Sequence, residues 1–191
     1  MLNISIKKEV NNIINFIKQI ERLKDTKRTA WTKEGRLEST AEHSWRLAVF
    51  AMLIENYFDN IDSKKLIKMS LIHDLGEAHE GDISAILDVD QKEKIKQEKE
   101  SFKELTSLLP DEKKDDLLSI WQEYNAGNTA EARLVKALDK METIIQHNQG
   151  DNPENFNYKF NLEYGTEYSD SNSILKIMRK LIDKDTRRKM S

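Results

Sequence analysis

The chain has no cysteine among its 191 residues. Disulfide frameworks, thiolate catalysis and cysteine-type zinc sites are therefore excluded. Only 6 glycines and 2 prolines occur, so residues that interrupt helices are scarce. No stretch approaches the roughly 20 consecutive apolar residues of a membrane span, and the amphipathic N-terminus lacks the apolar segment of a secretory signal. From these absences we expect a cytoplasmic protein without a membrane partner.

The chain also lacks an excess of charge of either sign. It has 31 basic and 34 acidic residues, for a formal net charge of -3. Without a global positive field, sequence-independent binding to a nucleic-acid polymer is disfavoured, although a local basic pocket for one phosphate remains possible. The length predicts one domain, residues 1–191, with its core at about 10–150 and a C-terminal loop and helix at 151–191.

Apolar residues recur at helical spacing along most of the chain, which predicts an all-α bundle of six or seven helices. Ser39 and Glu42 form a capping-box pattern, Asp62 can cap the next helix, and Asn128 with Glu131 resembles a second box. A polar stretch, 25–38, follows the first helix, residues 149–170 are interpreted as a long loop, and no strand is expected. The predicted helices lie near 7–24, 39–58, 62–73, 90–109, 117–124, 129–148 and 171–185.

Two of the four histidines and two aspartates stand in apolar helical surroundings. His43 shares a helix face with apolar residues four, seven and eleven positions later, so its ring points into the core. His73-Asp74 follows an apolar run at the end of a helix. Asp139 lies within another apolar stretch, where a carboxylate is costly to bury unless it is paired or bound to a metal. Two imidazoles and two carboxylates from three helices form a sensible site for a divalent ion.

Each of these four residues also has a simpler explanation when it is taken alone. A histidine on an apolar face is more often a hydrogen-bonded core residue than a ligand, and a helical aspartate can be a buried cap partner. Mixed nitrogen and oxygen ligands suit Mn, Co, Fe, Ni, Zn or Mg, so the ligand types do not choose the metal. We expect a divalent ion at this cluster.

The order His43, then His73-Asp74, then Asp139 resembles the HD-domain superfamily of metal-dependent phosphohydrolases. The flanking sequences make the resemblance specific to its YfbR/HDDC2-type branch, the 5'-deoxynucleotidases. They are Arg28-Thr-Ala-Trp31, Glu42-His43-Ser44, Leu71-Ile72-His73-Asp74-Leu75-Gly76-Glu77, Gly81-Asp82-Ile83 and Trp121-Gln-Glu-Tyr124. The resemblance covers roughly residues 10–150 and implies a helical HD fold.

The resemblance also implies roles for individual residues. The metal ligands would be His43, His73, Asp74 and Asp139. Glu77 and Asp82 would be the acid/base and water-orienting carboxylates, although alone they could be surface acids. Arg28 would hold the substrate phosphate and Trp31 would contact the sugar or base. Arg36 is a second phosphate candidate, and a salt bridge to Glu38 or Glu42 explains it equally well.

Several other residues have assignments outside that pattern. His79 can touch substrate or metal, but solvent exposure is the simpler interpretation. His147, near a helix C-terminus, is interpreted as a favourable partner of the helix dipole. Lys140 is expected to point away from the metal, because neighbours on a helix are about 100° apart. Trp45 and Trp121 are interpreted as core or interface aromatics.

The function that these patterns favour is hydrolysis of deoxynucleoside 5'-monophosphates to deoxynucleoside and phosphate. Two alternatives stay open: an HD phosphohydrolase acting on another nucleotide or small phosphate ester, and a non-catalytic nucleotide-binding regulatory module. The substrate is a small-molecule nucleotide in the favoured case. A homodimer is also expected, partly from the resemblance and partly because Phe156, Tyr158 and Phe160 lie in an expected loop, where exposed aromatic residues invite a partner.

Overall fold

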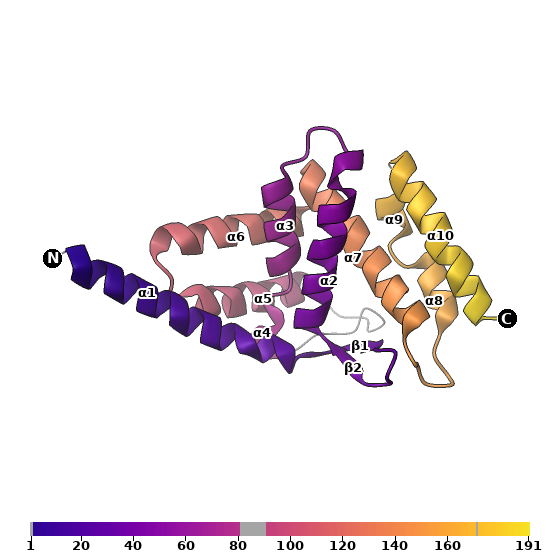
Figure 1. Ribbon diagram of the computed structural model, residues 1–191, viewed down its shortest axis with the longest axis horizontal. Coiled ribbons are helices and arrows are strands. Elements are labelled where there is room, and N and C mark those ends of the chain that lie inside the picture. Colours follow the sequence, from indigo (N-terminus) through magenta and orange to yellow (C-terminus); the bar gives the residue numbers. More distant parts are fainter. Residues whose placement is uncertain (1, 81–90, 171) are drawn as a thin grey trace.

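The computed structural model describes residues 2–80, 91–170 and 172–191 (Figure 1). Helices dominate these ranges, as the sequence predicts, and a small hairpin is added. The elements are α1 (Leu2–Gln19), η1 (Ile20–Lys24), β1 (Lys27–Trp31), β2 (Leu37–Ser39), α2 (Thr40–Ile54), η2 (Glu55–Tyr57), α3 (Ser63–Ile72), α4 (Glu77–Glu80), α5 (Gln91–Thr106), α6 (Asp111–Ala126), α7 (Ala130–Gln149), α8 (Tyr158–Glu163), α9 (Thr166–Ser169) and α10 (Ser173–Lys189).

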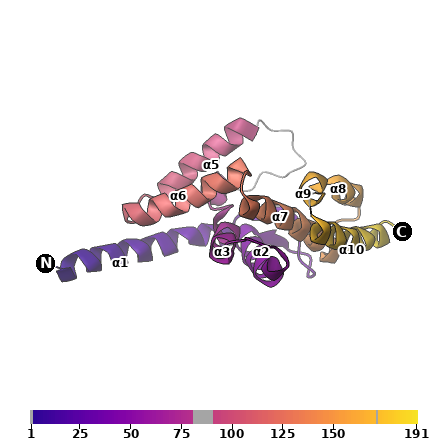
Figure 2. The ribbon, with the colours of Figure 1, turned by 90° about the horizontal axis from the view of Figure 1, so that it is seen from above.

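Helix α7 is the element around which the others assemble. It contacts α2, α3, α6, α9, α10 and β1. Figure 1 shows α2 and α3 beside it, with α10 on its other flank, and Figure 2 shows α5 with α6 and α8 with α9 covering the face away from α2 and α3. Most of its residues are buried, which includes polar ones such as Asp139, Glu142, Thr143 and Gln146. Residues of this helix can therefore meet residues from almost any other part of the chain.

The hydrophobic core lies where α3, α5, α6 and α7 meet. Trp121 is 1% exposed and its ring lies 5.4 Å from that of Phe102, which confirms the prediction of a core tryptophan. Trp45, in contrast, is 63% exposed on α2. No helix among the described residues is long and apolar enough to cross a membrane.

Helix starts follow the capping signals in the sequence closely. Ser39 and Glu42 form the predicted capping box, and the Asp62 side chain accepts a hydrogen bond from the Lys65 backbone N–H. The start of α7 differs by one residue, because Thr129 rather than Asn128 caps the helix. Glu131 does not complete a box there. It accepts a 3.0 Å hydrogen bond from the Asp62 backbone N–H instead, and so joins the start of α7 to that of α3.

The expectation that the chain has no strand is wrong, because β1 and β2, within the polar stretch 25–38 and at its end, pair as an antiparallel hairpin. Gly35 turns the chain with φ of +78°, a conformation that L residues with a side chain seldom adopt. The Thr32 N–H donates to the Arg36 carbonyl at 2.7 Å and the Gly35 N–H to the Thr32 carbonyl at 3.0 Å. The strands have five and three residues, so they are too short to show a clear alternation.

The interpretation of 149–170 as one long loop is also wrong, since it contains α8 and α9. The aromatic residues of this segment are not open to solvent. Phe156, Tyr158 and Phe160 are half-buried, and the Phe156 ring meets those of Trp31, Tyr158 and His147 at 6.1, 4.8 and 4.9 Å. The sequence argument that these three residues invite a partner therefore fails.

The hairpin is attached to the end of α7 at a close backbone contact. The Trp31 carbonyl accepts a hydrogen bond from the Gln146 side-chain amide, and the Asp151 N–H donates to the Thr32 carbonyl at 3.0 Å. A Cβ atom added to Gly150 would lie 2.2 Å from the Trp31 carbonyl oxygen. Glycine is thus required at this position for its lack of a side chain, because its φ of -66° is an ordinary one.

We predict that Gly150→Ala lowers the free energy of unfolding by about 1–3 kcal/mol, the usual cost of forcing an extra carbon into a packed contact. Urea denaturation followed by circular dichroism measures it. Asp151→Ala is the control, since it changes the exposed side chain of the next residue and keeps the backbone N–H that donates to the Thr32 carbonyl. A wild-type midpoint for Gly150→Ala would contradict the proposed contact.

Candidate metal centre and cavity

Three helices bring the four predicted metal ligands together. His43 lies in the first turn of α2, His73 and Asp74 follow the last turn of α3, and Asp139 lies midway along α7. His43 Nε2 is 3.1 Å from Asp139 Oδ1 and 3.8 Å from Asp74 Oδ2, and His73 Nε2 is 3.0 Å from Asp74 Oδ2. One ligand atom each from His43, His73 and Asp139 lie within 4.8 Å of one another. Residues almost a hundred positions apart thus form one compact cluster.

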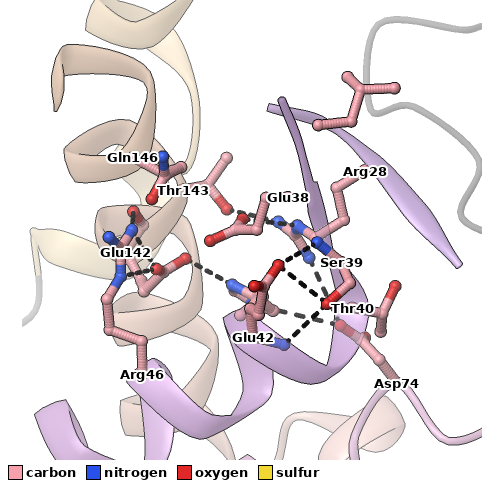
Figure 3. Close-up of polar contacts among 12 residues, drawn as sticks. Arg28, Glu38, Ser39, Thr40, Glu42, Arg46, Asp74, Glu142, Thr143 and Gln146 are labelled. Atoms are coloured by element: carbon pink, nitrogen blue, oxygen red, sulfur yellow. Dashed lines mark hydrogen bonds and ion pairs between the residues drawn. The ribbon is translucent and has the colours of Figure 1, made fainter. Parts of the chain in front are cut away.

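His43 is held by a carboxylate on the side away from the cluster. Its Nδ1 donates to Glu142, whose other oxygen accepts from Arg46. Figure 3 shows Arg46 beside Glu142. Burial and Arg28 lower the pKa of His43, but Glu142 and Asp139 outweigh them and raise this pKa to about 9. A site that favours a proton at this imidazole is a site that favours a cation, and a metal ion can take the place of that proton.

His73 is fixed by main-chain groups. Its Nδ1 lies 2.9 Å from the Ser70 carbonyl oxygen, which requires the ring to donate from Nδ1 and leaves a lone pair on Nε2. The Trp121 indole N–H donates to the His73 carbonyl at 3.1 Å. The core thus sets both the tautomer and the position of this histidine. Imidazole ligands of metals are usually oriented in this way by their second nitrogen.

Asp139 is 5% exposed and surrounded by donors. Its Oδ2 accepts from the Tyr124 hydroxyl at 3.2 Å and from Lys140 Nζ at 3.0 Å. Burial would raise the pKa of Asp139, but Lys140 and the two histidines hold this pKa well below its ordinary value. The expectation that Lys140 points away is wrong, because its long side chain returns to its neighbour's carboxylate despite the 100° between their Cα directions.

The donors present fit a divalent ion. His43 Nε2 and His73 Nε2 are buried and make no hydrogen bond, which is costly for polar atoms unless a further group lies between them. Burial would raise the pKa of Asp74, yet His73 and His43 keep it well below its ordinary value, so that carboxylate is ionised. His43, His73 and Asp139 form one compact group, and Asp74 lies within 3.8 Å of both imidazole Nε2 atoms. Two imidazole nitrogens and two carboxylates are a ligand set for a transition-metal ion or Mg.

The cluster opens into a cavity of about 600 Å³. His73, Asp74 and Asp139 line it, whereas the fully buried His43 lies behind them. The other lining residues include cations, acids and aromatic rings. They are Arg28, Trp31, Glu77, Lys94, Glu98, Tyr124, Lys136, Lys140, Thr143, His147, Phe156, Phe160, Tyr164, Glu167 and Tyr168, with several smaller or neutral residues between them.

Glu77 lies beside the cluster, as expected for a residue three positions after Asp74. Its backbone N–H donates to the Asp74 carbonyl at 3.0 Å, and its carboxylate accepts from the Thr40 hydroxyl at 3.4 Å. Glu77 is 5% exposed and lines the cavity. Asp82 falls outside the described residues, as does the side chain of His79, so their roles stay predictions from the sequence.

Arg28 and Trp31 both line the cavity, and Arg36 is not among the described lining residues. The Arg28 guanidinium, reaching from β1 in Figure 3, donates to Thr143 at 3.0 Å and lies 3.4 Å from Glu38 and 3.5 Å from Asp74. Arg36 is on the surface and pairs with Glu42, which is the simpler of its two interpretations.

Sequence reasoning missed some residues of the site and misplaced another. Glu142 was missed, although it lies three residues after Asp139 on a helix, and that spacing was the available signal. His147 is not an exposed partner of the helix dipole. It is buried and its Nδ1 donates to Asn161 Oδ1 at 2.8 Å, and burial lowers its pKa. Nothing local in the sequence indicates that contact, since Asn161 lies on another helix.

Comparisons with known proteins agree with this architecture. The family model of the HD domain matches residues 20–178. A human protein named 5'-deoxynucleotidase HDDC2 is 34% identical over 71% of this chain and 66% of its own length, and one from Dictyostelium discoideum is 38% identical over 72% and 76%. A crystal structure from Magnetospirillum magnetotacticum, described as a predicted metal-dependent phosphohydrolase, superposes with a TM-score of 0.78 and 26% identity over 95% of this chain and 94% of that one.

The match of the family model over most of the chain, the identity to the two relatives and the shared helical architecture agree with the geometry of the cluster. This chain belongs to the HD-domain family, among the relatives of the HDDC2-type 5'-deoxynucleotidases.

Proposed function

We propose that this protein is a metal-dependent 5'-deoxynucleotidase, which hydrolyses deoxynucleoside 5'-monophosphates to deoxynucleoside and phosphate. The observation that supports it most is the cluster of His43, His73, Asp74 and Asp139, which faces a cavity large enough for a nucleotide. The names of the HDDC2-type relatives support the substrate class.

The four cluster residues would hold one divalent ion, and the ligand types admit Mn, Co, Fe, Ni, Zn or Mg. When it is bound, such an ion lowers the pKa of a coordinated water and offsets charge on the phosphoryl oxygens. Glu142 keeps the His43 ring oriented, so that its Nε2 lone pair faces the cluster. Glu77 is placed to accept a proton from the attacking water, because its carboxylate lies at the cavity beside Asp74.

Positive side chains in the cavity suit a phosphate monoester. Arg28, Lys136 and Lys140 all line it, and Lys140 already contacts Asp139. Lys136 Nζ lies 4.3 Å from the centre of the Tyr124 ring, and burial together with Lys140 lowers its pKa, which marks a crowded positive region. A phosphate dianion would relieve that crowding. Arg28 can offer two parallel N–H donors to it.

Two alternatives use the same site. A different phosphate ester would require only another fit at the far end of the cavity. A non-catalytic nucleotide-binding module would need neither a complete ligand set nor Glu77 beside it, and this disfavours the second alternative.

We also propose that residues 1–191 form one domain and that it pairs as a homodimer. The support for one domain is that α9 and α10 pack against α7, and that α8 packs against α10. The support for a dimer is the exposed apolar stripe of α2, where Trp45, Met52 and Leu53 are 63%, 48% and 67% exposed. The cytoplasmic location stays a prediction from the sequence.

The substrate proposal predicts phosphate release from dAMP, dCMP, dGMP, dTMP and dUMP by protein loaded with Mn or Co, and none after chelation. Ribonucleotides should react at least about tenfold more slowly if the pocket is closed at the 2' position. Asp139→Ala should lose both activity and bound metal, whereas Asp185→Ala on the surface should lose neither. Metal-loaded protein that releases phosphate from none of the five would overturn the proposal.

Glu77→Gln tests the proton-transfer role. It keeps the size and the contact with Thr40 but cannot accept a proton, so we expect kcat to fall by about 100-fold or more while metal content and nucleotide affinity stay within about twofold. Single-turnover assays and calorimetry measure these quantities, and Glu104→Gln on the surface of α5 is the control. Undiminished kcat would assign proton transfer to another group.

The dimer proposal predicts twice the chain mass of 22.3 kDa by light scattering. Trp45→Glu should shift the protein to the monomer, because it replaces a largely exposed ring of the apolar stripe by a charge, and Lys7→Glu should not. A wild-type monomer at all accessible concentrations would refute this proposal.

A further inference from the structure

Part of the cavity has an aromatic lining that contributes no predicted metal ligand and that the hydrolysis itself does not use. Phe156, Phe160, Tyr164 and Tyr168 all lie on the segment that contains α8 and α9, and we call these four residues the aromatic wall. The Phe160 and Tyr164 rings are stacked, with centroids 4.9 Å apart and planes 29° apart. Phosphate chemistry needs charges and donors, so four rings on one side of the cavity require another explanation.

The aromatic wall is joined to the metal cluster through a short series of contacts. Lys140 Nζ lies 3.0 Å from Asp139 Oδ2 and 5.1 Å from the centre of the Tyr164 ring. Tyr164 in turn stacks on Phe160. A ligand whose phosphate lies near Asp139 and Lys140 therefore meets an aromatic surface at its other end, and a nucleoside presents a flat π-face there.

Two residues hold the aromatic wall in place, Gly165 and Arg179, and neither is among the residues that line the cavity. Gly165 lies in the turn between α8 and α9 and has φ of +70°. A Cβ atom there would lie 2.5 Å from Lys140 Cβ, so the turn can pack this closely on α7 only with glycine. Arg179 of α10 is 5% exposed, and its guanidinium donates to the Tyr164 carbonyl at 2.6 Å and the Asn161 carbonyl at 2.7 Å. Asp183 accepts from its Nε at 2.7 Å.

From this geometry we propose that the aromatic wall is the nucleobase subsite, and that Arg179 is a positioning residue that holds it against the cavity. The substrate class that follows is a nucleotide whose base stacks on Phe160, rather than a simple phosphate ester. This inference rests on the proposed function for the identity of the phosphate end, but it assigns a different part of the cavity lining, which includes neither the proposed metal ligands nor Glu77. The aromatic wall is thereby part of the active site and determines specificity, and Arg179 supports it from outside the cavity.

The experiment compares two ligands that differ only in the base, dTMP and 2-deoxyribose 5-phosphate. Each variant below is made twice. Calorimetry measures binding to Mn-loaded protein that also carries Glu77→Gln, and KM and kcat are measured on protein in which Glu77 is kept. Phe160→Ala removes the ring and Phe160→Tyr keeps it. Arg179→Gln removes the guanidinium that donates to the Tyr164 and Asn161 carbonyls. Arg188→Gln is the matched control, since Arg188 is an exposed arginine on the same helix.

We expect Phe160→Ala and Arg179→Gln to raise Kd and KM for dTMP at least about fivefold, which is the low end of what one stacked base contributes. Neither variant should change the values for 2-deoxyribose 5-phosphate by more than about twofold, and Phe160→Tyr should behave as the wild type. If Arg179→Gln lowers the thermal midpoint of the protein, the comparison of Phe160→Ala with Phe160→Tyr tests the inference by itself. Phe160 is half-buried, so its ring can be removed without opening the core.

Equal losses for both ligands would mean that the wall is structural only, and unchanged dTMP binding in Phe160→Ala would place the base elsewhere. Either result overturns the inference and leaves the proposed hydrolysis standing. Failure of the proposed function has a different signature, since the wild type would then release no phosphate from dTMP, while the calorimetric difference between the two ligands would still report on the wall.

Discussion

Two buried carboxylates on one helix direct the rest of this structure. Asp139 and Glu142 are 5% and 1% exposed, and both contact the same imidazole, that of His43. Ionised carboxylates are tolerated in such a position only when donors and positive charge surround them. Arg46 and Lys140 provide that charge from either side. A helix in the centre of the fold would ordinarily be apolar. Helix α7 carries buried polar residues there because they form the candidate metal site.

The parts of this arrangement that follow local rules could be predicted from the sequence. The capping box at Ser39 fixes where α2 begins, and so places His43 in its first turn, while Asp62 does the same for α3. The HD pair stands where an apolar run ends. These signals span a few residues each, and the structure follows them because each satisfies backbone N–H groups that have no other partner at a helix start.

The contacts that local rules do not describe are the ones that sequence reasoning missed. His147 pairs with Asn161, Arg28 with Thr143, and Arg179 with the Asn161 and Tyr164 carbonyls, and every one of these joins two different elements. The β1–β2 hairpin was missed for a related reason. Its strands are short, and its strongest stabilisation comes from the end of α7, where the Trp31 carbonyl meets Gln146 and the backbone of Gly150.

The division of the cavity into two ends has a physical basis. The metal end is built from α2, α3 and α7, which pack on the core, and His43 and His73 are 0% and 3% exposed there. The aromatic end is built from two short helices that are attached to α7 by Gly165 and to α10 by Arg179. Since short helices have little stability of their own, the position of the aromatic rings depends on those attachments. The reactive groups therefore belong to the buried, tightly packed part of the fold, and recognition belongs to the part whose position a few substitutions can change.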